Sequence, residues 1–170
     1  SPKVFNSGNT LFISSTYDSA NNKVVIAYKD SGNSGYGTAI VGAVSGDSIS
    51  FGIPEVFNSS STSTFSTSYD LVANKVIIAY RDTANSTYGT VIVGTVSGDS
   101  ISFGASEVFN SAPSSFISST YDSVARKAVI SYRDEDNSSH GTAVTYSSGG
   151  AVTNLTDSNY IGVSTGDYAD

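Results

Sequence analysis

Apolar residues along the first 58 positions fall into four short runs separated by polar turn residues. β-Branched residues dominate these runs, and no stretch carries a sustained apolar period of 3.6 residues, so strands are favoured over helices. Clusters of Ser, Asn, Gly and Asp between the runs supply turn chemistry. The pattern predicts no helix and four strands: FISSTYD (12–18), KVVIAYKD (23–30), YGTAIVGAV (36–44) and SISFGIPEVFN (48–58).

The second of these strands is apolar on both faces. Val24 to Ala27 are consecutive apolar residues, whereas a strand with one face in water would alternate apolar and polar positions. Other parts of the protein must therefore cover both faces. A stack of four-stranded sheets, each packed between two neighbours, accounts for this and is the blade arrangement of a β-propeller. A two-sheet sandwich would also bury the strand, but it does not explain the repeat.

The same pattern recurs along the chain with a period of 52 residues. Val4-Phe5-Asn6-Ser7 returns at 56–59 and 108–111, and KVVIAYKD returns as KVIIAYRD (75–82) and KAVISYRD (127–134). The predicted fold is therefore an all-β propeller built from three four-stranded, blade-like repeats. The predicted divisions are the end of a preceding blade's strand (1–7), repeat 1 (8–58), repeat 2 (59–110), a divergent repeat 3 (111–153) and a non-repeat segment or start of a further element (154–170).

Three blades are too few for a closed ring, because propellers use about 4–8 blades. The ring would close through a second copy of the chain, which makes a homo-oligomer, or through further repeats in a longer chain. Because 1–7 resembles only the end of a fourth strand, the sequence favours the longer chain.

The composition narrows the classes of function. With 8 Lys and Arg against 15 Asp and Glu, the 170-residue chain has a net charge of −7, which disfavours binding to nucleic acid or to an anionic membrane. Cysteine is absent, so disulfides, thiol chemistry and Cys-ligated zinc are excluded. No apolar run reaches the length of a membrane span, so membrane insertion is not expected.

Two resemblances bear on function. The repeated form TYD…KVVIAYRD…NSxYGTAxVGTVSGxSISFG…VFNS, followed by NYIGVSTGDYAD (159–170), resembles tandem repeats in tail-fibre and other virion structural proteins of bacteriophages, notably marine ones. This resemblance implies a non-enzymatic module, located on a virion or otherwise extracellular, whose partners are host cell-surface glycans or other virion proteins. The string VSGDSISFG (44–52 and 96–104) is similar to the Asp-box hairpin of sialidase-type propellers, whose Asp bonds local backbone amides.

Strand parity predicts where a ligand site would lie. In a four-stranded antiparallel unit, the loops after the second and fourth strands emerge on one face, so residues of every repeat gather there. Asn carboxamides can hydrogen-bond sugar hydroxyls, and an aromatic ring can stack on a sugar. Alternatively, the asparagines only satisfy turn geometry and the tyrosines cap the edge of the core. The candidate glycan-binding residues are Asn33, Tyr36, Asn85, Tyr88, Asn137 and His140.

Two groups of charged residues have both a functional and a structural interpretation. The tetrad DEDN (134–137) offers oxygens that could bind Ca²⁺, but equivalent loops carry half this charge or less, which favours a solvated loop. Lys29, Arg81 and Arg133 share one repeat position, and each precedes an Asp. They would form either a ring of cations for an acidic sugar or repeated surface ion pairs, and we favour the ion pairs.

Catalysis is not expected. His140 is the only histidine, and its neighbours Ser138 and Ser139 share its loop, whereas nucleophilic catalysis needs groups on separate scaffold elements. No metal-ligand spacing, phosphate loop or dinucleotide fingerprint occurs, so no cofactor is predicted apart from the Ca²⁺ alternative. Three interpretations remain, in order of preference: a phage virion module acting as scaffold or receptor-binding domain, a secreted oligomeric propeller lectin, and a degraded sialidase-like glycoside hydrolase.

Overall fold

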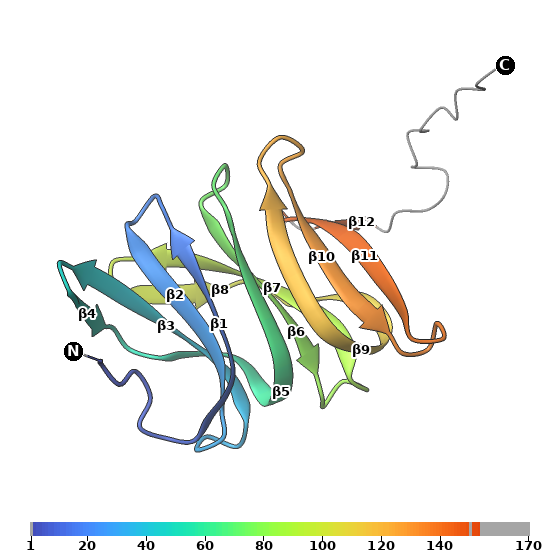
Figure 1. Ribbon diagram of the computed structural model, residues 1–170, viewed down its shortest axis with the longest axis horizontal. Helices are drawn as coiled ribbons and strands as arrows, with labels where there is room; N and C mark the ends of the chain where they lie inside the picture. Colours follow the sequence, from blue (N-terminus) through green and yellow to red (C-terminus); the bar gives the residue numbers. More distant parts are fainter. Residues whose placement is uncertain (1, 150, 154–170) are drawn as a thin grey trace, which may run out of the picture.

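The computed structural model describes residues 2–149 and 151–153, and these residues form strands and turns without a helix. In this part of the chain there is accordingly no helix long and apolar enough to cross a membrane. The strands run antiparallel in one continuous, twisted array (Figure 1). They are β1 (Thr10–Asp18), β2 (Lys23–Asp30), β3 (Tyr36–Ser45), β4 (Ser48–Phe51), β5 (Glu55–Asp70), β6 (Lys75–Asp82), β7 (Tyr88–Ser97), β8 (Ser100–Phe103), β9 (Glu107–Asp122), β10 (Lys127–Asp134), β11 (His140–Ser147) and β12 (Ala151–Thr153).

Three consecutive strands form an antiparallel meander, and this arrangement recurs. β1, β2 and β3 pair in sequence order, as do β5, β6 and β7, and then β9, β10 and β11. The second strand of the first set, β2, has the predicted bounds of 23–30. β1 begins earlier than predicted, at Thr10, and β3 ends one residue later, at Ser45. The all-β prediction is confirmed.

The predicted fourth strand, 48–58, is interrupted in the structure. β4 pairs with the end of β3, and β5 begins only at Glu55, after Pro54, which has no N–H to donate to a ladder. The start of β5 pairs with β3, and the strand then continues without a turn to pair with β6. β9 joins β7 and β10 in the same way. The predicted division at 58/59 therefore falls inside a strand.

The shared strands β5 and β9 divide the array into three units. Unit 1 contains β1–β4 and the start of β5 (55–58), unit 2 contains the rest of β5, β6–β8 and the start of β9 (107–110), and unit 3 contains the rest of β9 and β10–β12. The first strand of each unit has a positive φ at an equivalent residue: 50° at Phe12, 52° at Thr64 and 52° at Phe116. The pairing register shifts at each of these bulges, so the units share details of backbone path.

The hydrophobic core lies in two layers between the units. β6 contributes to both, because Val76 and Ile78 pack against unit 1, whereas Ile77 and Ala79 pack against unit 3. All four side chains are fully buried. The expectation that both faces are covered was made for β2, where Val25 and Ala27 are buried but Val24 and Ile26 on the other face are only half-buried. Full cover on both faces is found for β6, which lies in the central unit.

An aromatic residue at the start of each shared strand forms a wedge between the units. Phe57 of β5 lies over Gly37 of β3 and packs on Tyr80 of unit 2, with ring centroids 5.3 Å apart. Phe109 of β9 packs in the same way on Tyr132 of unit 3, at 5.1 Å. Each wedge therefore fixes the spacing of two neighbouring units.

Candidate functional site

The hairpins of the three units are sorted onto two edges of the array. The β2–β3, β6–β7 and β10–β11 loops lie along one edge, which we call the loop edge, and the β1–β2, β5–β6 and β9–β10 turns lie along the opposite edge (Figure 1). The segment that enters each first strand is bonded to this edge: Ser31 N–H donates to Asn9 O at 2.9 Å, and Thr83 N–H donates to Ser61 O at 3.1 Å. The structure therefore brings the loop after each second strand together with the segment that leads into each first strand, as strand parity predicts.

The candidate asparagines lie at the tips of the loop edge, and their side chains are exposed. The backbone carbonyl of each one accepts a hydrogen bond from the residue three positions further on, at 2.9 or 3.0 Å. The two middle residues of each turn have positive φ, for example 51° at Ser86 and 61° at Thr87, as in the two-residue turns that suit hairpins. These asparagines shape the turn through the backbone and leave their carboxamides free for solvent: Asn33, Asn85 and Asn137.

The aromatic candidates begin the third strand of each unit. Tyr36 and Tyr88 are half-buried, whereas His140 in unit 3 is exposed. Each of them is paired across the hairpin with the aspartate that ends the second strand. The six candidate residues therefore form three separate sets, one at each hairpin, instead of a single shared site.

The aspartates at the base of these hairpins are engaged by their own loops. Asp82 Oδ1 accepts hydrogen bonds from the N–H groups of Ala84 at 3.1 Å and Asn85 at 3.3 Å, and from the Ser60 hydroxyl at 3.2 Å. Asp30 Oδ1 accepts a backbone hydrogen bond of the same kind at 3.0 Å. These contacts identify both aspartates as turn-forming residues.

The acidic segment 134–137 offers no clustered cation site. Across the described ranges, 2–149 and 151–153, no group of three or more His, Asp or Glu side chains could hold a metal ion. Glu135 instead contacts Arg81 of unit 2, with 3.2 Å between Nη1 and Oε1. The nearby Ser115 hydroxyl, assisted by the charges of Arg81 and Arg133, holds the pKa of Glu135 below its ordinary value despite partial desolvation.

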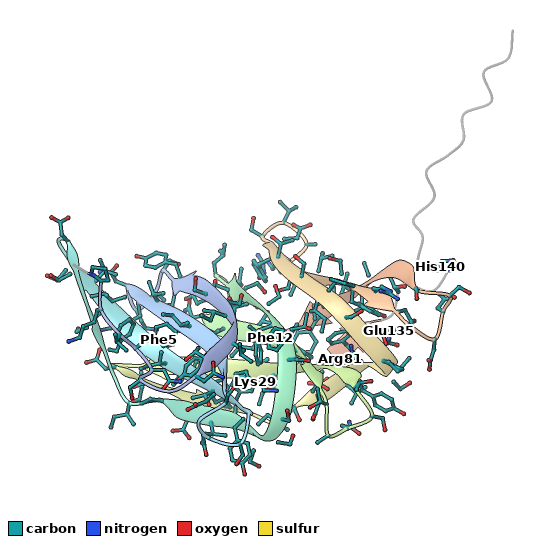
Figure 2. All side chains as sticks on the ribbon, turned by 60° about the horizontal axis from the view of Figure 1, so that its bottom comes forward. Phe5, Phe12, Lys29, Arg81, Glu135 and His140 are labelled. Carbon is teal, nitrogen blue, oxygen red and sulfur yellow. The ribbon has the colours of Figure 1, made fainter. Side chains whose placement is uncertain are left out.

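The three cations that share a repeat position do not converge. Lys29 Nζ donates to a serine hydroxyl of unit 2 at 3.0 Å, and Arg81 reaches Glu135 of unit 3. Figure 2 shows Lys29 and Arg81 at separate places along the array. Arg133 lies over the Phe116 ring of its own unit, with Cζ 5.8 Å from the ring centroid. These contacts do not form a ring of cations, and the expected repeat of ion pairs is not found among the described residues either, because Arg81 alone of the three forms an ion pair, with Glu135 and not with the aspartate that follows it.

A second set of contacts joins the units at the opposite edge. Asp18 is fully buried, and its Oδ1 accepts hydrogen bonds from the N–H groups of Ala20 and Asn21, both at 3.0 Å. Asp18 also interacts with the Tyr69 hydroxyl of unit 2. Burial raises the pKa of Asp18, but these hydrogen bonds outweigh burial and hold the pKa below 3.8. Asp18 is therefore a turn-forming residue of the β1–β2 hairpin.

The same junction recurs between units 2 and 3. Asp70 interacts with Tyr121, and burial together with the nearby Asp70 carboxylate raises the pKa of Tyr121 to about 12. That Asp18 and Asp70 each meet the tyrosine of the next unit was not predicted from the sequence. The signal that could have revealed it is the Tyr-Asp pair, which recurs at 17–18, 69–70 and 121–122.

The contacts expected from the Asp-box resemblance do not occur. Among the described residues, neither Asp47 nor Asp99 accepts a side-chain hydrogen bond from an amide of its own turn. Asp99 instead pairs with Lys23 of unit 1, with 2.6 Å between Nζ and Oδ1. Asp99 therefore contributes to a contact between units 1 and 2.

Comparison with protein-family models, with curated proteins and with solved structures found no match to this chain. Function is therefore inferred from the residues of the chain and their geometry.

Proposed function

We propose that the chain is a non-enzymatic, carbohydrate-binding part of a β-propeller. The observation that carries this proposal is the loop edge, where each unit presents an exposed asparagine whose backbone carbonyl is bonded to the tyrosine or histidine three residues further on. Carboxamides bond sugar hydroxyls as donor and acceptor, and flat rings stack on sugar faces. The six residues that would contact sugar are Asn33, Tyr36, Asn85, Tyr88, Asn137 and His140.

Two features support the propeller arrangement. The fourth strand of one unit leads directly into the first strand of the next, through β5 and β9. The first strands of neighbouring units also contact each other: Ser14 Oγ lies 3.0 Å from Thr67 Oγ1, and Ser66 Oγ lies 3.0 Å from Ser119 Oγ. Units that meet along their first strands are arranged as blades are around a central axis.

Repetition compensates for the small size of each contact. One hairpin offers a single asparagine and a single ring, which is little surface for a sugar. Three equivalent hairpins on one edge allow a branched or repetitive glycan to engage several at once. Linked engagement of this kind can raise affinity by about 10²–10⁴ without any new contact.

The bacteriophage resemblance supports a virion as the setting and a host-surface glycan as the ligand. A secreted lectin would use the same edge, whereas a purely scaffolding protein would leave the edge unused. A degraded glycoside hydrolase is disfavoured because Asp30 and Asp82 are engaged by their own loop amides. The Ca²⁺ alternative has no part in this proposal.

Binding of the purified chain to a panel of immobilised bacterial-surface glycans tests the proposal. We expect binding to at least one glycan, and an affinity loss of about 10-fold or more when all three asparagines are replaced, because avidity multiplies weak contacts. The variant carries Asn33→Ala, Asn85→Ala and Asn137→Ala, which preserve the backbone bonds of the turns.

Ser100→Ala is the matched control, because Ser100 is exposed at the start of β8, away from the candidate residues, and this variant should bind as the unmodified chain does. Absence of binding to every glycan, or undiminished binding by the triple variant, would contradict the proposal.

A further inference from the structure

Unit 1 exposes apolar side chains that the other units bury. Phe65 of unit 2 and Ile117 of unit 3 are 9% and 6% exposed, because each packs against the preceding unit. Ile13, the equivalent residue of unit 1, is 57% exposed. Val24 and Ile26 are only half-buried on the same face. Unit 1 therefore exposes an apolar face that is equivalent to the face that units 2 and 3 bury against the preceding unit.

Unit 3 exposes the complementary half of a junction. Asp18 and Asp70 are 0% and 4% exposed, and each meets a tyrosine of the next unit. Asp122, the equivalent residue of unit 3, is exposed. At the other end of the array, Tyr17 is 53% exposed, although its equivalents Tyr69 and Tyr121 face an aspartate.

Unit 3 also has a hollow where units 1 and 2 hold an aromatic wedge. Phe57 fills the space over Gly37, whereas no described atom lies within 4 Å of the position that a Cβ would take at Gly141. The hollow beside Gly141 has a volume of about 450 Å³, and Phe116 and Arg133 contribute to its lining.

Phe5 is the residue equivalent to these wedges at the start of the chain. Phe5 packs on Tyr28 with ring centroids 5.2 Å apart, as Phe57 packs on Tyr80 at 5.3 Å. Phe57 also lies against Gly37 of its own unit, unit 1. No unit precedes Phe5 among the described residues, so Phe5 has the contact with the following unit but not the contact that Phe57 makes with a glycine such as Gly37.

We propose that the free face of unit 3 binds the unit 1 face of a second copy of this chain, with Phe5 of that copy over Gly141. Two such junctions close a ring of six units, within the range of about 4–8 blades seen in propellers. The contacts at the junctions inside the chain recur with the period of 52 residues, so they predict three polar pairs between the copies. Unit 3 of one copy contributes the first residue of each pair and unit 1 of the second copy contributes the second: Ser118 with Ser15, Asp122 with Tyr17, and Lys127 with Asp47.

The free faces of unit 1 and unit 3 complement each other in three independent ways. Ile13 supplies apolar surface to the junction, Phe5 fits the hollow at Gly141, and Lys127 faces a carboxylate of opposite charge. This mutual fit identifies a second copy, and not an unrelated protein, as the occupant of the face. The inference concerns assembly and does not depend on carbohydrate binding.

Disulfide trapping tests the junction cleanly because the chain has no cysteine. The variant Ser15→Cys/Ser118→Cys should form a disulfide-linked species of about 35 kDa on a non-reducing gel, twice the chain mass of 17.5 kDa. The matched control Ser66→Cys/Ser119→Cys joins the equivalent positions inside one chain and should stay at 17.5 kDa. Light scattering of the unmodified protein should give the mass of a dimer.

Two substitutions then test the face itself. Gly141→Ala should raise the dimer dissociation constant by about 10-fold or more, because the added methyl meets Phe5 of the partner, while the unfolding midpoint of the separated chain does not fall. Ile13→Asp should abolish the dimer. Ile53→Asp, at a residue 77% exposed and outside the junction, should leave the dimer intact.

Each alternative outcome overturns a defined part of the proposal. A chain that remains monomeric while the control disulfide forms excludes the second copy and leaves the face to another part of the chain or to another protein. A ladder of multimers excludes the closed ring. A dimer that is insensitive to both Gly141→Ala and Ile13→Asp uses a different surface.

Discussion

Gly89 of β7 has no room for a side chain. A Cβ at this position would lie 2.5 Å from Cζ of Phe109 and 2.9 Å from Oγ of Ser114. Phe109 cannot retreat, because its side chain is 3% exposed and packs on Tyr132 with ring centroids 5.1 Å apart. Alanine in a strand is normally more stable than glycine by about 0.5–1 kcal/mol, but overpacking a core costs about 1–3 kcal/mol. We expect Gly89→Ala to lower the free energy of unfolding by about 1–2 kcal/mol.

Urea unfolding followed by circular dichroism measures this loss as a lower midpoint at unchanged slope. Gly104→Ala is the matched control, because the nearest atom to its Cβ position, the Val93 carbonyl oxygen, lies 3.9 Å away. This control should be neutral or slightly stabilising. Adding Phe109→Leu to Gly89→Ala should recover part of the loss by reshaping the crowded ring position. A Gly89→Ala variant that unfolds no earlier than the unmodified chain would refute the wedge.

Two further predictions concern stability. Thr87→Gly should raise the free energy of unfolding by about 1 kcal/mol, because a β-branched residue holds a φ of 61° where unit 1 has Gly35; an unchanged or lower melting temperature would contradict this. The folded-state pKa values of Asp18 and Asp70 lie below 3.8, so their stabilising contribution is present above pH 3.8 and is lost as the pH falls through the folded values. Asp18→Asn should therefore weaken the pH dependence of the unfolding midpoint over about pH 2–5, and an unaltered profile would count against the junction.

The regular strands were predictable because their signals are local. The run Val24–Ala27 and the turn residues around it define β2 without reference to any other part of the chain. The continuity of β5 was not predictable in this way, because its two halves pair with different strands, β3 and β6. Pairing partners are long-range facts, and the polar residues 58–64 resemble a loop when read alone.

The candidate site was predictable in position but not in detail. Strand parity places Asn33 and its equivalents on one edge, and the structure agrees. Strand parity does not reveal that Asp82 is engaged by its own loop, because that contact depends on distances of about 3 Å within a turn. The contact of Asp18 with Tyr69 was missed for a related reason: each residue has a sufficient local explanation, a turn former and a strand aromatic.

The shared strands have a mechanical consequence. β5 and β9 each belong to two units, so no unit can unfold without removing a strand from its neighbour. Tension applied to the ends of the chain is carried across each boundary by a strand hydrogen-bonded on both sides, and not by a flexible linker. The three units should therefore resist pulling as one body and yield together.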